Sequence, residues 1–259
     1  MKILILTQEE NLYLPNSFAQ VCRAYPADIA CIVAAPAMST HGGPIKGFFR
    51  HLRLFGFKGT AIMACRVVRA KWLNLNHKTA EHGPFHSIAA VARTFGIPYH
   101  AIGSVNTDLA PILDKFVPEL LISISCPQII GKAIRQRLPR GCINVHGAPL
   151  PRYRGLMPAF WALKYNEAVT AVTVHDLSDK LDNGSILAQR EVAISPGDTW
   201  DSLVRKTKAA GAELLVEVIR QIQDGREQRR PNLDEQATYF SFPTAADRRA
   251  FVKSGRCFF

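Results

Sequence analysis

Two polar residues, Asn144 and His146, stand two positions apart at the end of the apolar segment GCINVH. Alternate residues of a β-strand point to the same side of the sheet, so both side chains are expected to face one place. The following residues, GAPLPRYRG, include Pro149 and Pro151, which interrupt strand pairing and turn the chain into a corner. An amide that can donate a hydrogen bond and an imidazole that can exchange a proton are therefore predicted at the rim of a pocket.

A carboxylate further along the chain can complete this pair. Asp182 lies in the segment KLDNGS, between two β-branched segments, AVTAVTVHDL and SILAQREVAI. An Asn-Gly pair is typical of a tight turn, so Asp182 could be an ordinary turn residue. In the alternative interpretation, its carboxylate orients the His146 ring and supports the cationic form of that ring. On these residues alone, both interpretations stay open.

Apolar and amphipathic segments alternate along the chain and predict the elements that position these residues. Strands are expected at residues 3–6, 28–35, 97–102, 120–125, 141–146, 168–177 and 185–194. Helices are expected at residues 18–23, 44–73, 87–96, 109–116, 129–137, 158–165 and 199–222, the second of them as one or two helices broken by Gly56 and Gly59. The alternation predicts an α/β fold with a mostly parallel, helix-covered sheet, whose last two strands form an antiparallel extension. Ligands of such sheets bind beyond the carboxyl ends of the strands, where Asn144 and His146 are expected.

Composition narrows the class of protein. With 259 residues, 47% hydrophobic and 20% charged, the chain is expected to form one globular domain with a substantial core. It has no apolar run of the roughly 20 residues that span a bilayer. Six scattered cysteines, without a Cys-x-x-Cys pair, argue against a zinc site and favour a reducing, cytoplasmic location. The absence of Gly-x-Gly-x-x-Gly and P-loop motifs disfavours dinucleotide binding and P-loop phosphate transfer.

The net charge of +11 is concentrated in one stretch. Residues 29–80 contain no Asp or Glu; their basic residues are Lys46, Arg50, Arg53, Lys58, Arg66, Arg69, Lys71 and Lys78. Interleaved Phe and Leu residues, as in GFFRHLRLFGFKG, favour substrate phosphates or an anionic membrane surface over bulk RNA as a partner. In the alternative interpretation, the Phe and Leu side chains pack on the sheet and leave a solvated basic face.

Residues 141–199 resemble the formyltransferases that use 10-formyltetrahydrofolate, namely the catalytic domain of methionyl-tRNA formyltransferase and the sugar N-formyltransferases. The family pattern is Asn-x-His, a Leu-Pro corner and an Asp-x-Gly loop, which here are Asn144, His146, Leu150-Pro151, Asp182 and Gly184. The element order agrees with the family over most of residues 85–220. One departure is HGAPLP, where many members carry HPSLLP. The resemblance implies a Rossmann-like formyltransferase fold and N-formyl transfer to a primary amine, without a metal. It also implies that the catalytic residues are Asn144, His146 and Asp182.

The resemblance further implies where the substrates bind. The pterin of the folate is expected between the segment SISCPQII and the loop DLSDKLD, against main-chain groups and apolar walls. The folate-binding positions are Ser125, Cys126, Pro127, Gln128, Ile129, Leu177, Asp179, Lys180 and Leu181. Arg152, Tyr153 and Arg154 are expected to bind the acceptor, because the guanidinium groups of the two arginines suit the diphosphate of a nucleotide-linked acceptor.

Residues 1–222 are predicted to form the catalytic domain, with a basic helical insert at 43–82 and a short extension at 223–259. The residues after Ile222 are too few for the β-barrel domain that methionyl-tRNA formyltransferases carry. We therefore expect a phosphate-bearing small-molecule acceptor, a nucleotide-linked amino sugar. Methionyl-tRNA, another amine, or a non-catalytic folate-binding module are the alternatives. Peripheral contact with an anionic surface through residues 43–78 and a homodimer both stay open, and nucleic-acid binding is disfavoured without being excluded.

Overall fold

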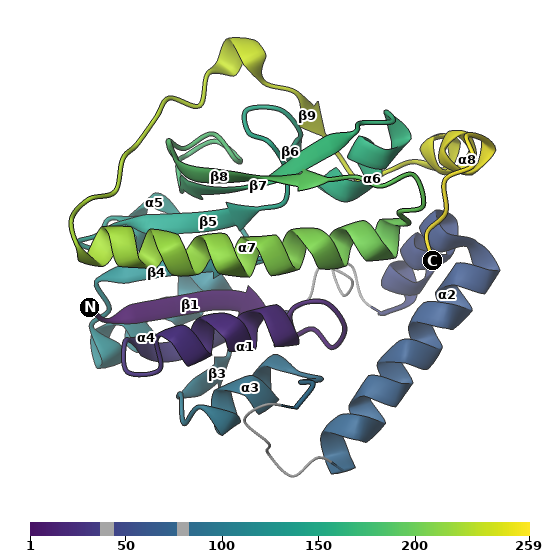
Figure 1. The fold of residues 1–259 in the computed structure, drawn as a ribbon. Helices are drawn as coiled ribbons and strands as arrows, with labels where there is room; N and C mark the ends of the chain where they lie inside the picture. The colour runs from purple at the N-terminus through teal and green to yellow at the C-terminus, as the bar shows by residue number, and fades with distance from the viewer. Residues whose placement is uncertain (37–43, 77–82) are drawn as a thin grey trace.

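A seven-stranded sheet in the order β3-β2-β1-β4-β5-β7-β8 forms the centre of the protein (Figure 1). The structure is a computed structural model that describes residues 1–36, 44–76 and 83–259. Its sheet strands are β1 (Ile3–Gln8), β2 (Ile29–Ala35), β3 (Tyr99–Ala101), β4 (Leu120–Ile124), β5 (Cys142–His146), β7 (Val169–Asp176) and β8 (Ile186–Ala193). The first five pair in parallel, whereas β7 is antiparallel to both β5 and β8. The predicted α/β fold, with its antiparallel extension, is confirmed.

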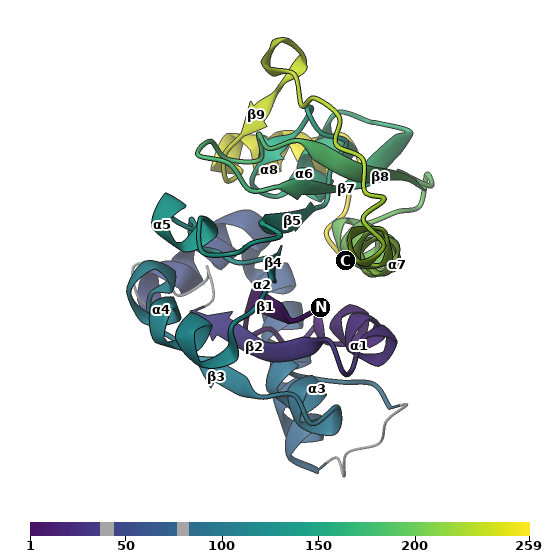
Figure 2. The same ribbon diagram turned by 90° about the vertical axis from the view of Figure 1, so that its left-hand side faces the viewer.

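Helices cover both faces of the sheet, as the view along its edge shows (Figure 2). The helices are α1 (Pro15–Ala24), α3 (Ile88–Thr94) and α7 (Trp200–Gln223) on one face, and α4 (Val105–Phe116) and α5 (Lys132–Arg135) on the other. Ile3 and Ile5 of β1 belong to the core under the first group, and Leu4 and Leu6 belong to the core under the second. A parallel strand that is buried on both faces has no need of polar alternation, which explains the continuous apolar run ILIL.

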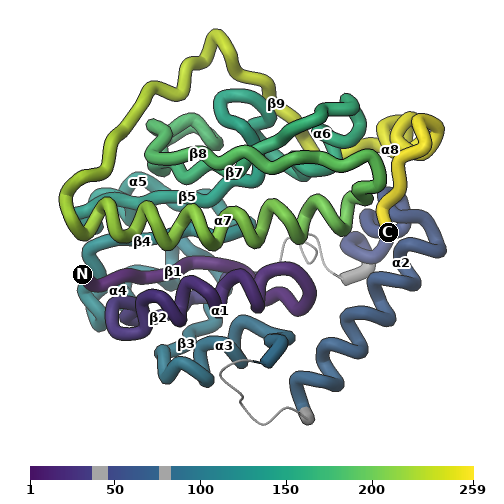
Figure 3. The backbone as a smooth tube through the Cα atoms, viewed as in Figure 1, coloured from purple at the N-terminus to yellow at the C-terminus, as the bar shows by residue number. Residues whose placement is uncertain are grey.

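A smaller layer is built by the segments that follow β5 and α7. It contains β6 (Arg154–Gly155), α6 (Pro158–Lys164), a 3₁₀ turn (Asp234–Gln236), β9 (Tyr239–Phe240) and α8 (Ala245–Lys253). β6 and β9 pair in parallel, so the chain after α7 returns across the molecule to the corner that follows β5 (Figure 3). Phe160, Trp161, Phe251 and Phe258 form the centre of a third, aromatic core there.

The helix α2 (Pro44–Asn76) extends away from the sheet (Figure 1). It is kinked at Gly56, whose φ of 70° is a left-handed conformation that favours glycine. The prediction of a second break at Gly59 is wrong, because this residue is helical. A Cβ at Gly59 would lie 2.9 Å from Phe55 Cβ and 3.1 Å from the Phe259 ring. Residues 43 and 77–82 of the predicted insert lie outside the described residues. Within the part of the chain that the structure describes, no helix is both long and apolar enough to cross a membrane.

Candidate active site

The end of β5 and the loop after β7 bring together Asn144, His146 and Asp182. His146 Nδ1 lies 3.7 Å from Asp182 Oδ2, and both side chains are buried, with 7% and 8% of their residues' surface exposed. His146 Nε2 lies 2.9 Å from the main-chain oxygen of Tyr153. Because a carbonyl oxygen can only accept a hydrogen bond, Nε2 is assigned the proton. Nδ1, facing Asp182, is therefore the nitrogen left for proton transfer.

A second histidine, His175 of β7, completes the cluster. The antiparallel register of β5 and β7 places His175 directly opposite Asn144, and its Nε2 lies 3.1 Å from Asn144 Nδ2. His175 Nδ1 is 2.8 Å from the main-chain oxygen of Asp176, so Nδ1 carries the proton and Nε2 accepts from the Asn144 amide. This arrangement fixes the amide with its nitrogen toward His175, and a second N–H on that nitrogen remains.

Burial keeps His175 neutral. Its residue is 1% exposed, and burial lowers its pKa to about 4, against the raising effect of the Asp182 charge. Its Nε2 is 3.7 Å from Asp182 Oδ1. At neutral pH the ring is therefore a neutral acceptor that orients Asn144. The sequence reasoning did not single out His175, because its role depends on the register between two strands.

The main chain around Asp182 is held in an unusual shape. Asp182 has a φ of 49°, which costs a residue with a side chain about 1 to 2 kcal/mol. Gly155 N donates to Asp182 Oδ2 at 2.8 Å. At Gly184 a Cβ would lie 1.8 Å from the main-chain oxygen of Asp176, so only glycine fits there. Asn232 Nδ2 donates to the main-chain oxygens of Asp182 and Gly184, at 2.9 and 3.0 Å.

A cavity of about 530 Å³ lies beside this cluster, at the carboxyl ends of β4 and β5. One wall is the segment after β4, and the opposite wall is the loop after β7. All nine predicted folate-binding residues line it: Ser125, Cys126, Pro127, Gln128, Ile129, Leu177, Asp179, Lys180 and Leu181. Asn144, His146 and Asp182 line it as well. The cavity is within the usual size range of small-molecule sites.

Comparison with known proteins identifies the family. Residues 58–219, more than half of the chain, match the family described as formyl transferase. The chain belongs to this family. A curated relative, methionyl-tRNA formyltransferase of Agathobacter rectalis, is 37% identical over 129 residues, which cover 50% of this chain and 42% of that protein. The match thus spans less than half of the relative's length.

Solved formyl transferase structures share the fold. Glycinamide ribonucleotide transformylase 1 from Symbiobacterium toebii has a TM-score of 0.61 at 18% identity, over 90% of this chain and 93% of that chain. An N-formyltransferase from Helicobacter canadensis, in complex with folinic acid and dTDP-3-aminofucose, has a TM-score of 0.57 at 16% identity, over 93% and 71% of the two chains. At such identities the likeness concerns the fold, and the predicted Rossmann-like formyltransferase fold is confirmed.

The residues predicted to bind the acceptor lie elsewhere in this formyl transferase. Arg154 is buried and donates to Asp234 Oδ1 at 2.6 Å and to Asn232 Oδ1 at 2.8 Å. Arg152 Nη1 and the Tyr153 hydroxyl both contact Glu167, at 3.4 and 2.6 Å. None of the three lines the cavity. In this structure the Arg152 and Tyr153 side chains contact Glu167, and the Arg154 side chain contacts Asp234 and Asn232, rather than the cavity.

Lys208 of α7 lines the same cavity and was not predicted. Its ammonium donates to Ser125 Oγ at 2.6 Å, and burial lowers its pKa, while the charge of Glu10 opposes that shift. The signal was present in the sequence, because Lys208 follows Val204 by four residues and precedes Gly211 by three, on the stripe of α7 that faces the sheet. A lysine on an apolar stripe is a candidate functional residue. Within the described ranges, no group of three or more His, Cys, Asp or Glu could hold a metal ion.

Proposed function

We propose that this formyl transferase moves a formyl group from 10-formyltetrahydrofolate to a primary amine. The observation that carries the proposal is the cluster of Asn144, His146 and Asp182 in the wall of one large cavity. Membership of the formyl transferase family supports it. Two related structures whose descriptions name 5-N-formyl-THF and folinic acid support folate as the donor.

The cluster provides what the reaction needs. The amine nitrogen bonds to the formyl carbon, and the formyl oxygen becomes negative. The remaining N–H of Asn144 can donate to that oxygen, and one such donor contributes about 3 kcal/mol. The bond between the carbon and N10 of the folate then breaks, and the proton leaves the amine for N10. His146 Nδ1, beside the Asp182 carboxylate, can hold and pass on that proton.

The cavity suits the flat pterin ring of the donor. Ile129, on the wall after β4, is 73% exposed, and Leu181, on the opposite loop, is 45% exposed. Apolar side chains left in solvent on two facing walls are the expected surroundings of an aromatic ligand. The main chain of residues 125–129 and 177–181 supplies polar groups that can pair with the edge of the pterin.

As the acceptor we propose an amino sugar linked to a nucleotide diphosphate. The solved structures whose descriptions name dTDP or dTDP-3-aminofucose support this acceptor. Two observations favour alternatives: the TM-score of the Symbiobacterium toebii transformylase favours glycinamide ribonucleotide, and the 37% identity to the Agathobacter rectalis protein favours methionyl-tRNA.

All six cysteines are free, which supports a reducing compartment such as the cytoplasm.

A direct assay decides between these acceptors. Purified protein is incubated with 10-formyltetrahydrofolate and, separately, with dTDP- and UDP-linked amino sugars, glycinamide ribonucleotide and methionyl-tRNA. Release of tetrahydrofolate is followed by absorbance, and the formylated product by mass spectrometry. We expect turnover with an amino sugar and none with His146→Ala. Turnover with another amine alone would overturn the acceptor, and no turnover with any amine despite folate binding would leave a folate-binding module.

A further inference from the structure

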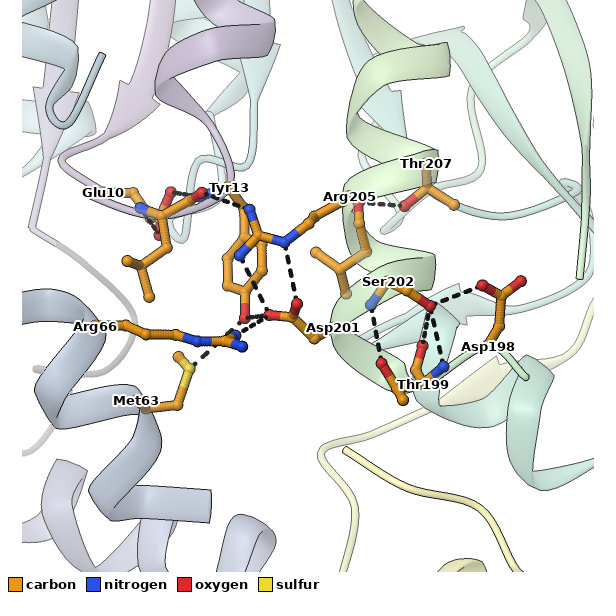
Figure 4. A network of polar contacts seen from close by, with 12 residues as sticks. Glu10, Tyr13, Met63, Arg66, Asp198, Thr199, Asp201, Ser202, Arg205 and Thr207 are labelled. Atoms are coloured by element: carbon orange, nitrogen blue, oxygen red, sulfur yellow. Dashed lines mark hydrogen bonds and ion pairs between the residues drawn. The ribbon is translucent and has the colours of Figure 1, made fainter. Parts of the chain in front are cut away.

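One side of α2 beyond the kink is attached to the body of the protein (Figure 4). Arg66 Nη1 lies 2.7 Å from Asp201 Oδ1, the same carboxylate oxygen to which the Tyr13 hydroxyl donates at 2.6 Å. The Tyr13 hydroxyl is also 3.6 Å from Met63 Sδ. Arg66 and Met63 therefore mark the face of α2 that is turned inward. Residues 57–76 of the helix span about 30 Å at 1.5 Å per residue.

The opposite side of this segment carries an exposed apolar stripe. Phe57, Val68 and Leu75 are 83%, 67% and 84% exposed, and Trp72 is 61% exposed. At 3.6 residues per turn, the first three lie on the side opposite Arg66. We define the α2 stripe as Phe57, Ala61, Ala64, Val68, Trp72 and Leu75, which are all exposed. Single exposed apolar residues are ordinary, but a row of them along five helical turns marks an interaction surface.

The charges beside the α2 stripe indicate its partner. Lys58, Arg69 and Lys71 are exposed on its flanks, and residues 29–80 contain no acidic residue at all. A second copy of this helix would bring like charges together, which disfavours pairing between two stripes. An apolar row with basic flanks and a tryptophan matches the interface of an anionic bilayer, where lipid phosphates lie beside the acyl boundary.

We propose that α2 is an interfacial helix that docks the protein on an anionic lipid surface. Phe57, Val68, Trp72 and Leu75 enter the boundary between head groups and acyl chains, while Lys58, Arg69 and Lys71 bind lipid phosphates. The inward face keeps its contacts with Tyr13 and Asp201, so docking needs no rearrangement of the site. The proposal is independent of the acceptor, because none of the α2 residues lines the cavity.

Vesicle flotation tests the charged part of this surface. Wild-type protein is mixed with vesicles of phosphatidylcholine alone or with phosphatidylglycerol added, and we expect binding only to the second. Lys58→Gln/Arg69→Gln/Lys71→Gln is expected to weaken the partition coefficient about a hundredfold, about fivefold for each charge. The matched control, Lys2→Gln/Arg220→Gln/Arg226→Gln, removes three exposed charges far from α2 and is expected to bind like wild type.

A second variant tests the apolar part. Phe57→Ser/Leu75→Ser is expected to lower partitioning at least tenfold, because two large apolar side chains are no longer buried in the acyl boundary. Val117→Ser/Leu233→Ser, which changes exposed apolar residues elsewhere, serves as its control. The melting temperature of every variant is expected to equal that of wild type. Equal binding to neutral and anionic vesicles would overturn the proposal. It would also be overturned if the protein formed concentration-dependent dimers that Phe57→Ser/Leu75→Ser abolishes, or if it bound an acidic protein but no vesicles.

Discussion

At the scale of single residues, the Asn144 amide is predicted to be the main stabiliser of the developing negative charge. His175 holds one of its N–H groups at 3.1 Å and leaves the other for the substrate. Asn144→Ala is therefore expected to lower kcat about a hundredfold or more, with little change in the melting temperature. Steady-state kinetics with the best acceptor measure this effect. Asn166→Ala, an exposed asparagine remote from the cavity, is the control, and near-normal turnover of a folded Asn144→Ala protein would exclude the oxyanion role.

His175 predicts a pH dependence of stability. Burial lowers its pKa to about 4 from an ordinary value of 6.5, so the unfolded chain binds a proton that the folded chain excludes. The corresponding stability is present above pH 6.5 and is lost as the pH falls towards 4, by about 3 kcal/mol at most. His175→Gln keeps an acceptor for Asn144 but does not titrate. Urea unfolding from pH 7 to 4 is expected to show a shallower decline for this variant than for wild type. His51→Gln, which replaces a histidine of α2 outside the cluster, is the control. If stability of His175→Gln declined as steeply as that of wild type or of this control, the assignment would be contradicted.

At the scale of elements, the segment after α7 fastens the Asp182 loop. Asn232 donates to the main-chain oxygens of Asp182 and Gly184, and Arg154 joins Asn232 to Asp234. Asn232→Ala leaves two carbonyl groups without their donor, which costs roughly 1 to 3 kcal/mol of stability. We expect kcat to fall about tenfold and hydrogen exchange at residues 182–184 to increase. Asn106→Ala is the control, because the hydrogen bonds of Asn106 lie on the opposite wall of the cavity, and it should leave exchange in the Asp182 loop unchanged. If Asn232→Ala lost stability without altered exchange in this loop, the role of Asn232 would be purely structural.

Element order could be predicted from the sequence, but lateral contacts could not. Alternation along β5 placed Asn144 and His146 on one side, and the Asp-x-Gly loop brought Asp182 to the same sheet edge. His175 and Asn232 escaped prediction, because one depends on the register of β5 with β7 and the other on the path of the chain after α7. The contacts of Arg152 with Glu167 and of Arg154 with Asp234 could not be predicted either, since they join residues far apart in the sequence, and acceptor binding by these arginines stays a prediction. The catalytic roles themselves stay predictions.

At the scale of the whole molecule, Asp201 joins three segments that are far apart in sequence. Its carboxylate accepts from Tyr13 before α1, from Arg66 of α2 and from Arg205 of α7, and Figure 4 shows the three converging on it. Burial acts to raise the pKa of Asp201, but hydrogen bonds from Arg205 and Tyr13 hold this pKa below its ordinary value. This carboxylate therefore attaches both α2 and the segment before α1 to α7.

Removing that charge is expected to loosen α2. Asp201→Asn should lower the free energy of unfolding by about 2 kcal/mol, because two guanidinium groups lose their counter-ion. Urea unfolding measures the loss. Relative to wild type, the rate of hydrogen exchange should increase more in residues 57–76 than in β1 or β4. Asp224→Asn, which affects only an exposed pair with Arg226, is the control. Uniformly faster exchange over the whole chain would indicate global destabilisation instead.

The return of the chain from α7 to the corner after β5 also orders events during synthesis on the ribosome. Every strand of the seven-stranded sheet has been made once Ala193 is added, yet Arg154 and the Asp182 loop receive Asn232 and Asp234 only after all of α7 has followed. A nascent chain halted before that point can form the sheet, but its substrate cavity lacks a fastened wall. Capture of folate by stalled chains should therefore begin late, when residues 232–240 have left the exit tunnel.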